Sequence, residues 1–185
     1  MYEAFKSLGA LSIAIGWASM LFLVFKWRGD KSMSFSRHAA AHKSAFLTMA
    51  IMESIFLPMY FVFIATWFVH AFQLPVIFTV LNAISVIGLL VAAWVPDVPG
   101  IRGEIHHRVC YPAYASMPII ALFLAFSGSV GHFARVYNVF AFIVMSICGV
   151  YIAHKAKTGG SQFLLLQGLF LASIHSAILI TVYVH

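Results

Sequence analysis

The chain alternates between long apolar runs and short polar segments. Each run has about 20 or more residues, the length that a helix needs to cross the hydrocarbon core of a membrane. Glycine, proline and charged residues occupy the segments between the runs. This pattern predicts an all-α protein, a bundle of six transmembrane helices. We place the helices at about residues 4–25, 44–72, 75–95, 109–130, 133–154 and 162–184.

The composition agrees with a membrane protein of one domain. Of the 185 residues, 63% are hydrophobic and only 9% are charged, whereas a soluble domain carries roughly 25% charged residues. So few charges cannot cover a surface that faces water, and membrane lipid is therefore the expected partner over most of the molecule. Residues 1–185 are predicted to form a single transmembrane domain.

The positive charges are divided unevenly between the two ends of the predicted helices. Nine of the eleven Lys and Arg residues lie in or beside the first, third and fifth loops, and only Lys6 and Arg135 lie at the other end. Because positively charged loops stay in the cytoplasm, this bias places both termini on the non-cytoplasmic side of the cell (inner) membrane. The net charge of +6 does not indicate nucleic-acid binding, since the charges form no continuous face. The pattern is compatible with a monomer or an oligomer.

Small residues form stripes on the first and the last predicted helix. In lipid, helices associate through the close packing of small residues rather than through a hydrophobic drive. The first helix carries Gly9, Ser12, Gly16 and Ser19 on one side. The stripe on the last helix comprises Gly168, Ala172 and Ser176. We expect neighbouring helices to pack closely on both stripes.

Glu53 is the most informative single residue. It lies roughly 14 Å deep in the second run at 1.5 Å per residue, where an acidic side chain costs on the order of 3 kcal/mol. It should therefore face the interior of the bundle, paired or protonated. His175 and Asn82 reach a similar depth, so a Glu53–His175–Asn82 network could form a proton relay or substrate site, or a neutral clamp between helices. One stripe of its helix joins His42, Met49, Glu53 and Tyr60.

A second group of ionisable side chains gathers at the predicted cytoplasmic face. His38 and His42 form an H-x3-H pair that would share one face of a helix. Glu104, His106 and His107 follow in the third loop. Imidazole and carboxylate are common ligands of divalent metals, so these five residues are the candidate metal ligands. Histidines at helix ends also titrate or extend to the interface without binding metal, and this alternative stays open.

A b-type haem is a further alternative for the histidines. It requires two histidines on facing helices at the same depth. His42 and His154 lie at the predicted inner edge, and His70 and His132 lie at the outer edge. All four sit at helix ends, where a haem would be poorly enclosed.

The segment Trp94–His106 resembles a signature of uncharacterised prokaryotic six-helix membrane proteins, a family of unknown function. In that family an aromatic-Pro-x-Asp ends the third span, a short Gly-containing loop follows, and a His opens the fourth span. Here Val95 stands where an aromatic residue is usual, and Asp97 directly follows the proline. The resemblance implies fold and membrane location but no activity. It also implies that Asp97 and His106 are the first loop residues to test, with Asp97 capping the next turn or pairing with His106 or His107.

These features leave four functions open. The first is a membrane-embedded enzyme or metal-binding protein that acts at the cytoplasmic face, with Asp97 and His106 as candidate catalytic residues. The second is a small transporter or proton-coupled carrier that uses Glu53 and His175. The other two are a structural or accessory membrane subunit without chemistry, and an electron carrier with a b-type haem.

Overall fold

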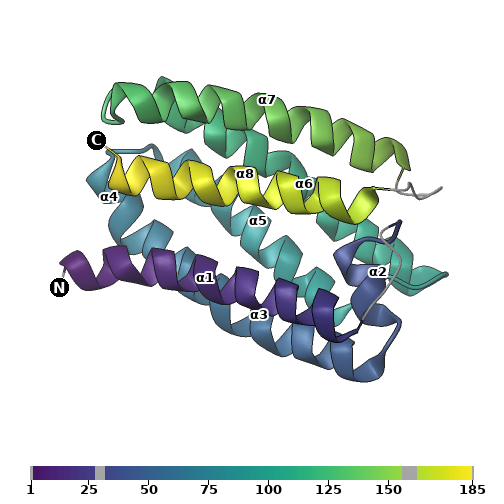
Figure 1. Cartoon of the computed structure of the whole chain (residues 1–185). Helices are drawn as coiled ribbons and strands as arrows, with labels where there is room; N and C mark the ends of the chain where they lie inside the picture. The colour runs from purple at the N-terminus through teal and green to yellow at the C-terminus, as the bar shows by residue number, and fades with distance from the viewer. Residues whose placement is uncertain (1, 28–31, 156–161, 185) are drawn as a thin grey trace.

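A computed structural model describes residues 2–27, 32–155 and 162–184 of the chain (Figure 1). Within these ranges the chain is helical apart from its turns and loops. The elements are α1 (Tyr2–Lys26), α2 (Phe35–Ala40), α3 (Lys43–Phe63), the π-helical η1 (Ile64–Phe68), α4 (Val69–Ala71), α5 (Val76–Trp94), α6 (Ile101–Phe126), α7 (His132–Lys155) and α8 (Phe163–Tyr183).

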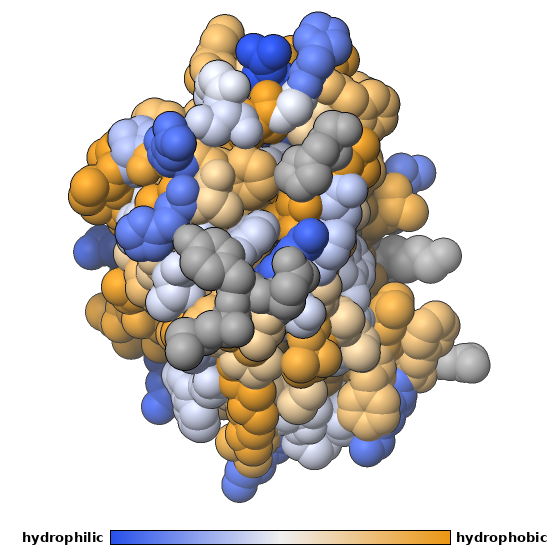
Figure 2. Space-filling model, turned by 90° about the vertical axis from the view of Figure 1, so that its left-hand side faces the viewer, coloured by the Kyte–Doolittle hydropathy of each residue, from blue (hydrophilic) through white to orange (hydrophobic). Residues whose placement is uncertain are grey.

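Six stretches of helix in the described chain are long and apolar enough to cross a membrane, which confirms the prediction from the apolar runs. One of them, Lys43–Ala71, combines α3, η1 and α4. Large apolar side chains lie on the outside of the bundle, and Phe140, Ile147 and Val150 of α7 are each more than half exposed. Figure 2 looks onto the end of the bundle where both termini lie, and there hydrophobic side chains alternate with groups of hydrophilic ones. The architecture is that of a multi-pass helical membrane protein.

Both termini lie at the same end of the bundle, which we call the terminal end (Figure 1). The opposite end, where α2 and the turn between α5 and α6 lie, is the loop end. Around the bundle, α1 packs against α3, α3 against α5, and α5 against α6. The helix α7 packs against both α6 and α8. It is the least buried of the six spans, and Figure 1 shows it along one side of the bundle, beside these two helices.

The helix α6 begins eight residues earlier than the fourth apolar run predicts. It starts at Ile101, directly after Gly100, whose φ of 98° belongs to the left-handed region that favours glycine. Backbone hydrogen bonds do not require apolar side chains, so the exposed and polar first turns extend the helix beyond the apolar run. His106 and His107 consequently lie in a helix, and their placement in a loop was wrong.

The short helix α2 separates the two histidines of the H-x3-H pair. Ser34 caps its start, since the Ser34 Oγ accepts a hydrogen bond from the backbone N–H of Arg37 at 3.1 Å. The helix ends at Ala40, and His42 has extended backbone angles (φ −135°, ψ 125°) before α3 begins. His38 is buried, whereas His42 is exposed. The prediction that both imidazoles share a helix face is wrong because the helix is interrupted between them.

Aromatic rings fill the terminal half of the interior. The ring of Phe68 in η1 lies 4.9 Å from the ring of Phe72 and stacks at 5.8 Å on the ring of Phe78 of α5, measured between centroids. Phe63 lies against Phe68 from the preceding turn, with centroids 5.6 Å apart. All four rings are buried. Helices α3, η1 and α5 are therefore joined here by interlocking rings.

The small-residue stripe of α1 is confirmed, whereas that of α8 is wrong at Gly168. A Cβ added at Gly9 would lie 2.8 Å from the ring of Phe63, and one at Gly16 would lie 3.1 Å from the ring of Phe56. Only glycine permits α1 to lie this close to α3 and its rings. At Gly168, such a Cβ would have no atom of a neighbouring helix in the described chain within 4 Å.

Candidate functional site

A cavity of about 100 Å³ extends from the middle of the bundle toward the loop end, and we call it the central chamber. Side chains from α1, α2, α3, α5, α6 and α8 line it. Most of its lining is apolar. Six polar side chains line the central chamber and no other cavity described below: Ser12, Glu53, Tyr60, Asn82, Ser85 and His175.

Glu53 faces the central chamber as the sequence predicts. Met49, Glu53 and Tyr60 all line it, as steps of four and seven residues along one helix face require. His42, the fourth residue of the predicted stripe, is instead exposed before the start of α3. Among the described residues, the Glu53 carboxylate has no hydrogen bond or ion pair, and no Lys or Arg side chain lines the chamber. The acid therefore has no counter-ion from this part of the chain.

His175 lines the same chamber from α8, and no hydrogen bond or ion pair joins it to Glu53 in the described structure. Its Nδ1 is buried and has no hydrogen-bond partner in the described structure. The His175 ring stands edge-on to the ring of Trp17 on α1, with centroids 6.0 Å apart. Asn82 donates to a carbonyl of its own helix at 2.9 Å and accepts from the Tyr60 hydroxyl at 3.4 Å. The three predicted partners thus share one chamber, but no hydrogen bond joins them into a network.

A second cavity of about 80 Å³, the loop-end cavity, adjoins the central chamber. Five side chains from α2, α6 and α8 line both cavities and form the layer between them: Ser36, His106, Cys110, Tyr114 and Gln167. One layer of mostly polar side chains therefore separates Glu53 and its surroundings from the loop end.

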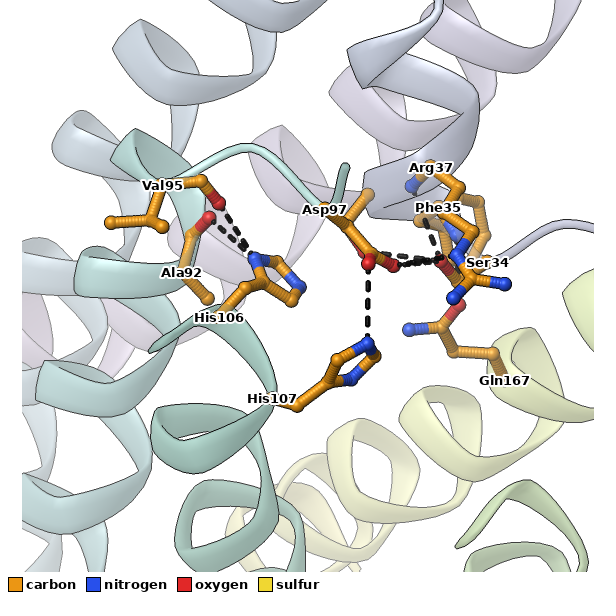
Figure 3. A network of polar contacts seen from close by, with 10 residues as sticks. Ser34, Phe35, Arg37, Ala92, Val95, Asp97, His106, His107 and Gln167 are labelled. Atoms are coloured by element: carbon orange, nitrogen blue, oxygen red, sulfur yellow. Dashed lines mark hydrogen bonds and ion pairs between the residues drawn. The ribbon is translucent and has the colours of Figure 1, made fainter. Parts of the chain in front are cut away.

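Asp97 is buried beside the loop-end cavity, between His107 on one side and residues of α2 on the other (Figure 3). Its Oδ2 accepts hydrogen bonds from the hydroxyls of Ser34 at 3.2 Å and Ser36 at 3.4 Å, and pairs with the Nε of Arg37 at 3.2 Å. Its Oδ1 lies 3.3 Å from the Nε2 of His107. Of the predicted alternatives for Asp97, the contact with His107 is the one that forms. A carboxylate with these partners attaches α2 to the bundle.

Gln167 of α8 makes the second attachment of α2. Its Oε1 accepts a hydrogen bond from the backbone N–H of Phe35 at 2.9 Å, and its Nε2 donates to the Tyr114 hydroxyl at 2.6 Å. The sequence reasoning missed both Gln167 and Tyr114. A signal was present for Gln167, because it is a polar residue in an apolar run two turns before His175.

His106 is held in one orientation by the backbone of α5 and the residue after it (Figure 3). Its Nδ1 lies 2.7 Å from the carbonyl oxygen of Val95 and 3.1 Å from that of Ala92. Since a carbonyl oxygen can only accept, Nδ1 carries the hydrogen and donates. In the described structure, His106 makes no hydrogen bond to Asp97, so that predicted alternative does not form. Its side chain lines both cavities.

The structure does not support the predicted metal site. Across residues 2–27, 32–155 and 162–184, no group of three or more His, Cys, Asp or Glu side chains is placed to hold a metal ion. His38 is buried in α2 with neither ring nitrogen hydrogen-bonded, and His42 is exposed. On α6, Glu104 is exposed, His106 is buried and His107 is half-buried, because nearby positions on a helix point in different directions. The five candidate ligands therefore do not converge.

The histidines considered for a haem are all exposed at the ends of the bundle. They are His42, His70, His132 and His154. Exposed rings at helix ends do not enclose a porphyrin, so the geometry of the described chain does not favour a haem site.

Comparisons with known proteins find no relative of this chain. No protein-family model matches it, and neither a curated protein nor a solved structure matches it. The resemblance of Trp94–His106 to a family of uncharacterised membrane proteins therefore stays a prediction. Function has to be argued from the central chamber and the loop-end cavity.

Proposed function

We propose that the protein is a small proton-linked membrane carrier whose central chamber receives the transported molecule. Glu53 carries the proposal: it is an acid in the middle of a span, it faces a cavity, and it has no counter-ion among the described residues. His175 adds a base to the same chamber from α8. A purely structural subunit has no need for a cavity that reaches an unpaired acid.

The cost of burying an unpaired charge links this chamber to protons. An ionised carboxylate in an apolar surrounding is expensive unless a positive charge accompanies it. Because the described lining contains no Lys or Arg, a proton or a bound cation is the simplest source of that charge. A site that takes up one or the other couples the movement of a molecule to the movement of a proton.

We place the loop end in the cytoplasm and both termini outside the cell membrane. The Lys and Arg residues support this orientation, because nine of the eleven belong to the loops of that end or their edges. The loop-end cavity then lies between the central chamber and the cytoplasm. The layer between the two cavities includes His106 and Gln167, whose side chains line both of them.

The proposal is tested by reconstituting the protein into vesicles that hold a pH-sensitive dye and by measuring changes of the internal pH. Wild type, Glu53→Gln and Glu104→Gln are compared while panels of small metabolites are added under an imposed pH gradient. We expect that adding at least one compound causes proton movement across vesicles with the wild type or Glu104→Gln, but not across vesicles with Glu53→Gln. Glu104 is the matched control because it is an exposed acid at the loop end.

Infrared spectra of the same variants report whether the Glu53 carboxyl exchanges a proton. The carrier is refuted if Glu53→Gln behaves like the wild type with every compound and the spectra show no exchangeable proton on Glu53.

His106 favours a second candidate, an enzyme that acts at the loop-end cavity. Two carbonyls hold its Nδ1, and an imidazole of fixed orientation suits a general base. Cys110 lies one turn further along α6 and lines the same cavities. Mass spectrometry of a membrane-lipid extract incubated with wild type or His106→Gln tests this candidate. A product made only by the wild type favours the enzyme, and identical extracts argue against it.

A further inference from the structure

We infer that the central chamber binds a small organic cation, an ammonium compound, with Glu53 as its counter-ion. The inference rests on the proposed carrier function and names the class of molecule that it transports. Four properties of the chamber support this class: its charge, the chemistry of its walls, its size, and the ionisable groups around Glu53.

The charge of the lining selects against anions. Glu53 is the one acidic side chain among the described lining residues, and no Lys or Arg accompanies it. The nearby Arg37 lines only the loop-end cavity and is already paired with Asp97 at 3.2 Å. An anion would therefore meet an acid and no Lys or Arg, and a neutral ligand would supply no counter-ion for the ionised acid. An organic cation supplies the missing charge where the low dielectric strengthens the attraction.

The walls of the chamber select an organic cation over an inorganic one. Aromatic side chains line it, namely Phe35, Phe56, Tyr60 and Tyr114. Aromatic faces attract ammonium groups, and apolar walls accept the carbon substituents of such a group. A hard inorganic cation instead requires a shell of about six oxygen ligands. The few oxygens in this apolar lining do not form such a shell.

The volume limits the size of the ligand. The central chamber measures about 100 Å³, somewhat less than the roughly 150 Å³ of an apolar cavity that binds benzene. A quaternary ammonium group with one short substituent is of this size. The adjoining loop-end cavity, of about 80 Å³, can receive the end of a longer substituent if the layer between the cavities yields.

Binding exchanges one positive charge for another without a redox or covalent step. The protonated carboxyl of Glu53 releases its proton to solvent, and the resulting carboxylate pairs with the cation. The ionisable side chains that line the chamber with Glu53 are Tyr60 on α3, His106, Cys110 and Tyr114 on α6, and His175 on α8. The described lining of α1, α2 and α5 contains no ionisable side chain. His175 lines the same chamber with an unpaired Nδ1 and is a second group there that can bind a proton.

Choline and 3,3-dimethylbutan-1-ol are a matched pair of probes, because they share a shape and differ in charge. Titration calorimetry with the whole 185-residue chain measures binding, and a pH dye in weak buffer measures proton release. We expect saturable binding of choline with release of a proton, and no binding of the neutral alcohol. Glu53→Gln should weaken choline binding roughly tenfold or more and abolish proton release, while Glu104→Gln should behave like the wild type. Glu53→Asp keeps the charge and should retain proton release with weaker binding, which separates loss of charge from loss of fold.

The outcomes of these experiments distinguish a failure of the cation site from a failure of the proposed carrier function. No choline binding by the wild type, or equal binding of the alcohol without proton release, overturns the cation site. If infrared spectra still show an exchangeable proton on Glu53 in that case, the carrier proposal stands and only the substrate class is wrong. If Glu53 exchanges no proton and Glu53→Gln has no effect, both fail.

Discussion

Phe63, Phe68 and Phe78 fill the terminal half of the bundle, whereas the loop-end half contains two cavities and the contacts of Asp97. In lipid, helices gain little from hydrophobic association, so close packing has to hold them together. The interlocked rings provide that packing at the terminal end. In the loop-end half, the close packing is interrupted by the central chamber and by the polar contacts to the short helix α2. The buried aromatic rings and the two interior cavities thus lie at opposite ends of the same helices.

Phe68→Ala should give the largest effect among the variants that test this division. Phe68 is fully buried among other rings, and its removal leaves a void in close-packed surroundings. We expect the free energy of unfolding to fall by about 3 kcal/mol. The matched control is Phe56→Ala, whose ring borders the existing central chamber as well as α1, so that its removal should cost clearly less. Unfolding in mixed micelles with increasing dodecyl sulfate measures both variants, and equal losses would contradict the comparison.

Asp97→Asn should loosen the loop end and leave the terminal end intact. The substitution removes the charge that holds Arg37 and His107 at 3.2 and 3.3 Å. Because hydrogen bonds to charged groups are the stronger ones, we expect a loss of about 2 kcal/mol. Hydrogen–deuterium exchange should quicken in α2 and remain slow around Phe68. Unchanged exchange in α2 would show that Asp97 does not hold this helix.

Gln167→Leu tests the second attachment of α2 with a smaller expected effect. It removes the acceptor for the Phe35 N–H and the donor to the Tyr114 hydroxyl, at a cost of about 1 kcal/mol. Looser packing of α2 should speed maleimide labelling of Cys110, which lines both cavities. Gln162→Leu alters an exposed glutamine at the start of the same helix and serves as the control.

For the labelling experiment, the background is Cys148→Ser, which removes the only other cysteine. Equal labelling rates in Gln167→Leu and Gln162→Leu would argue that Gln167 does not hold α2 in place.

Gly9→Ala probes the packing of α1 on the aromatic rings and should give the smallest effect. The added Cβ would lie 2.8 Å from the Phe63 ring, which is locked among other rings and cannot yield easily. We expect a loss of about 1 kcal/mol. Gly168→Ala adds a Cβ in open space and should leave the free energy of unfolding unchanged or slightly raised. The same micelle titration measures both, and a loss at Gly168 as large as at Gly9 would remove the distinction.

The number of spans and the position of Glu53 could be predicted because both depend on local properties. Length and apolarity mark a span, and steps of four and seven place Met49 and Tyr60 beside Glu53 on one face. The start of α6 could not be predicted in the same way, since a helix continues through polar residues where hydropathy falls. The break before His42 was missed for a related reason. Apolar counting does not register where a backbone leaves the helical conformation.

The contacts at the loop end depend on the tertiary arrangement and were beyond sequence reasoning. The Phe35 N–H binds a side chain 132 positions away, and Ser34 binds one 63 positions away. No periodicity within a single helix predicts such pairs. The predicted metal site failed for the same reason, because residues that are close in sequence, such as Glu104 and His106, point to different surroundings.

The outer position of α7 has a consequence for biosynthesis. It contributes nothing to the lining of the central chamber, yet it precedes α8, which does. While the ribosome extends the chain, helices α1 to α6 enter the membrane with one side of the chamber open and Glu53 unshielded. The wall closes when α7 and α8 have both been inserted and α8 has docked beside α1. Until that moment the nascent protein exposes its acid, so the central chamber becomes a closed compartment only once α8 is in place.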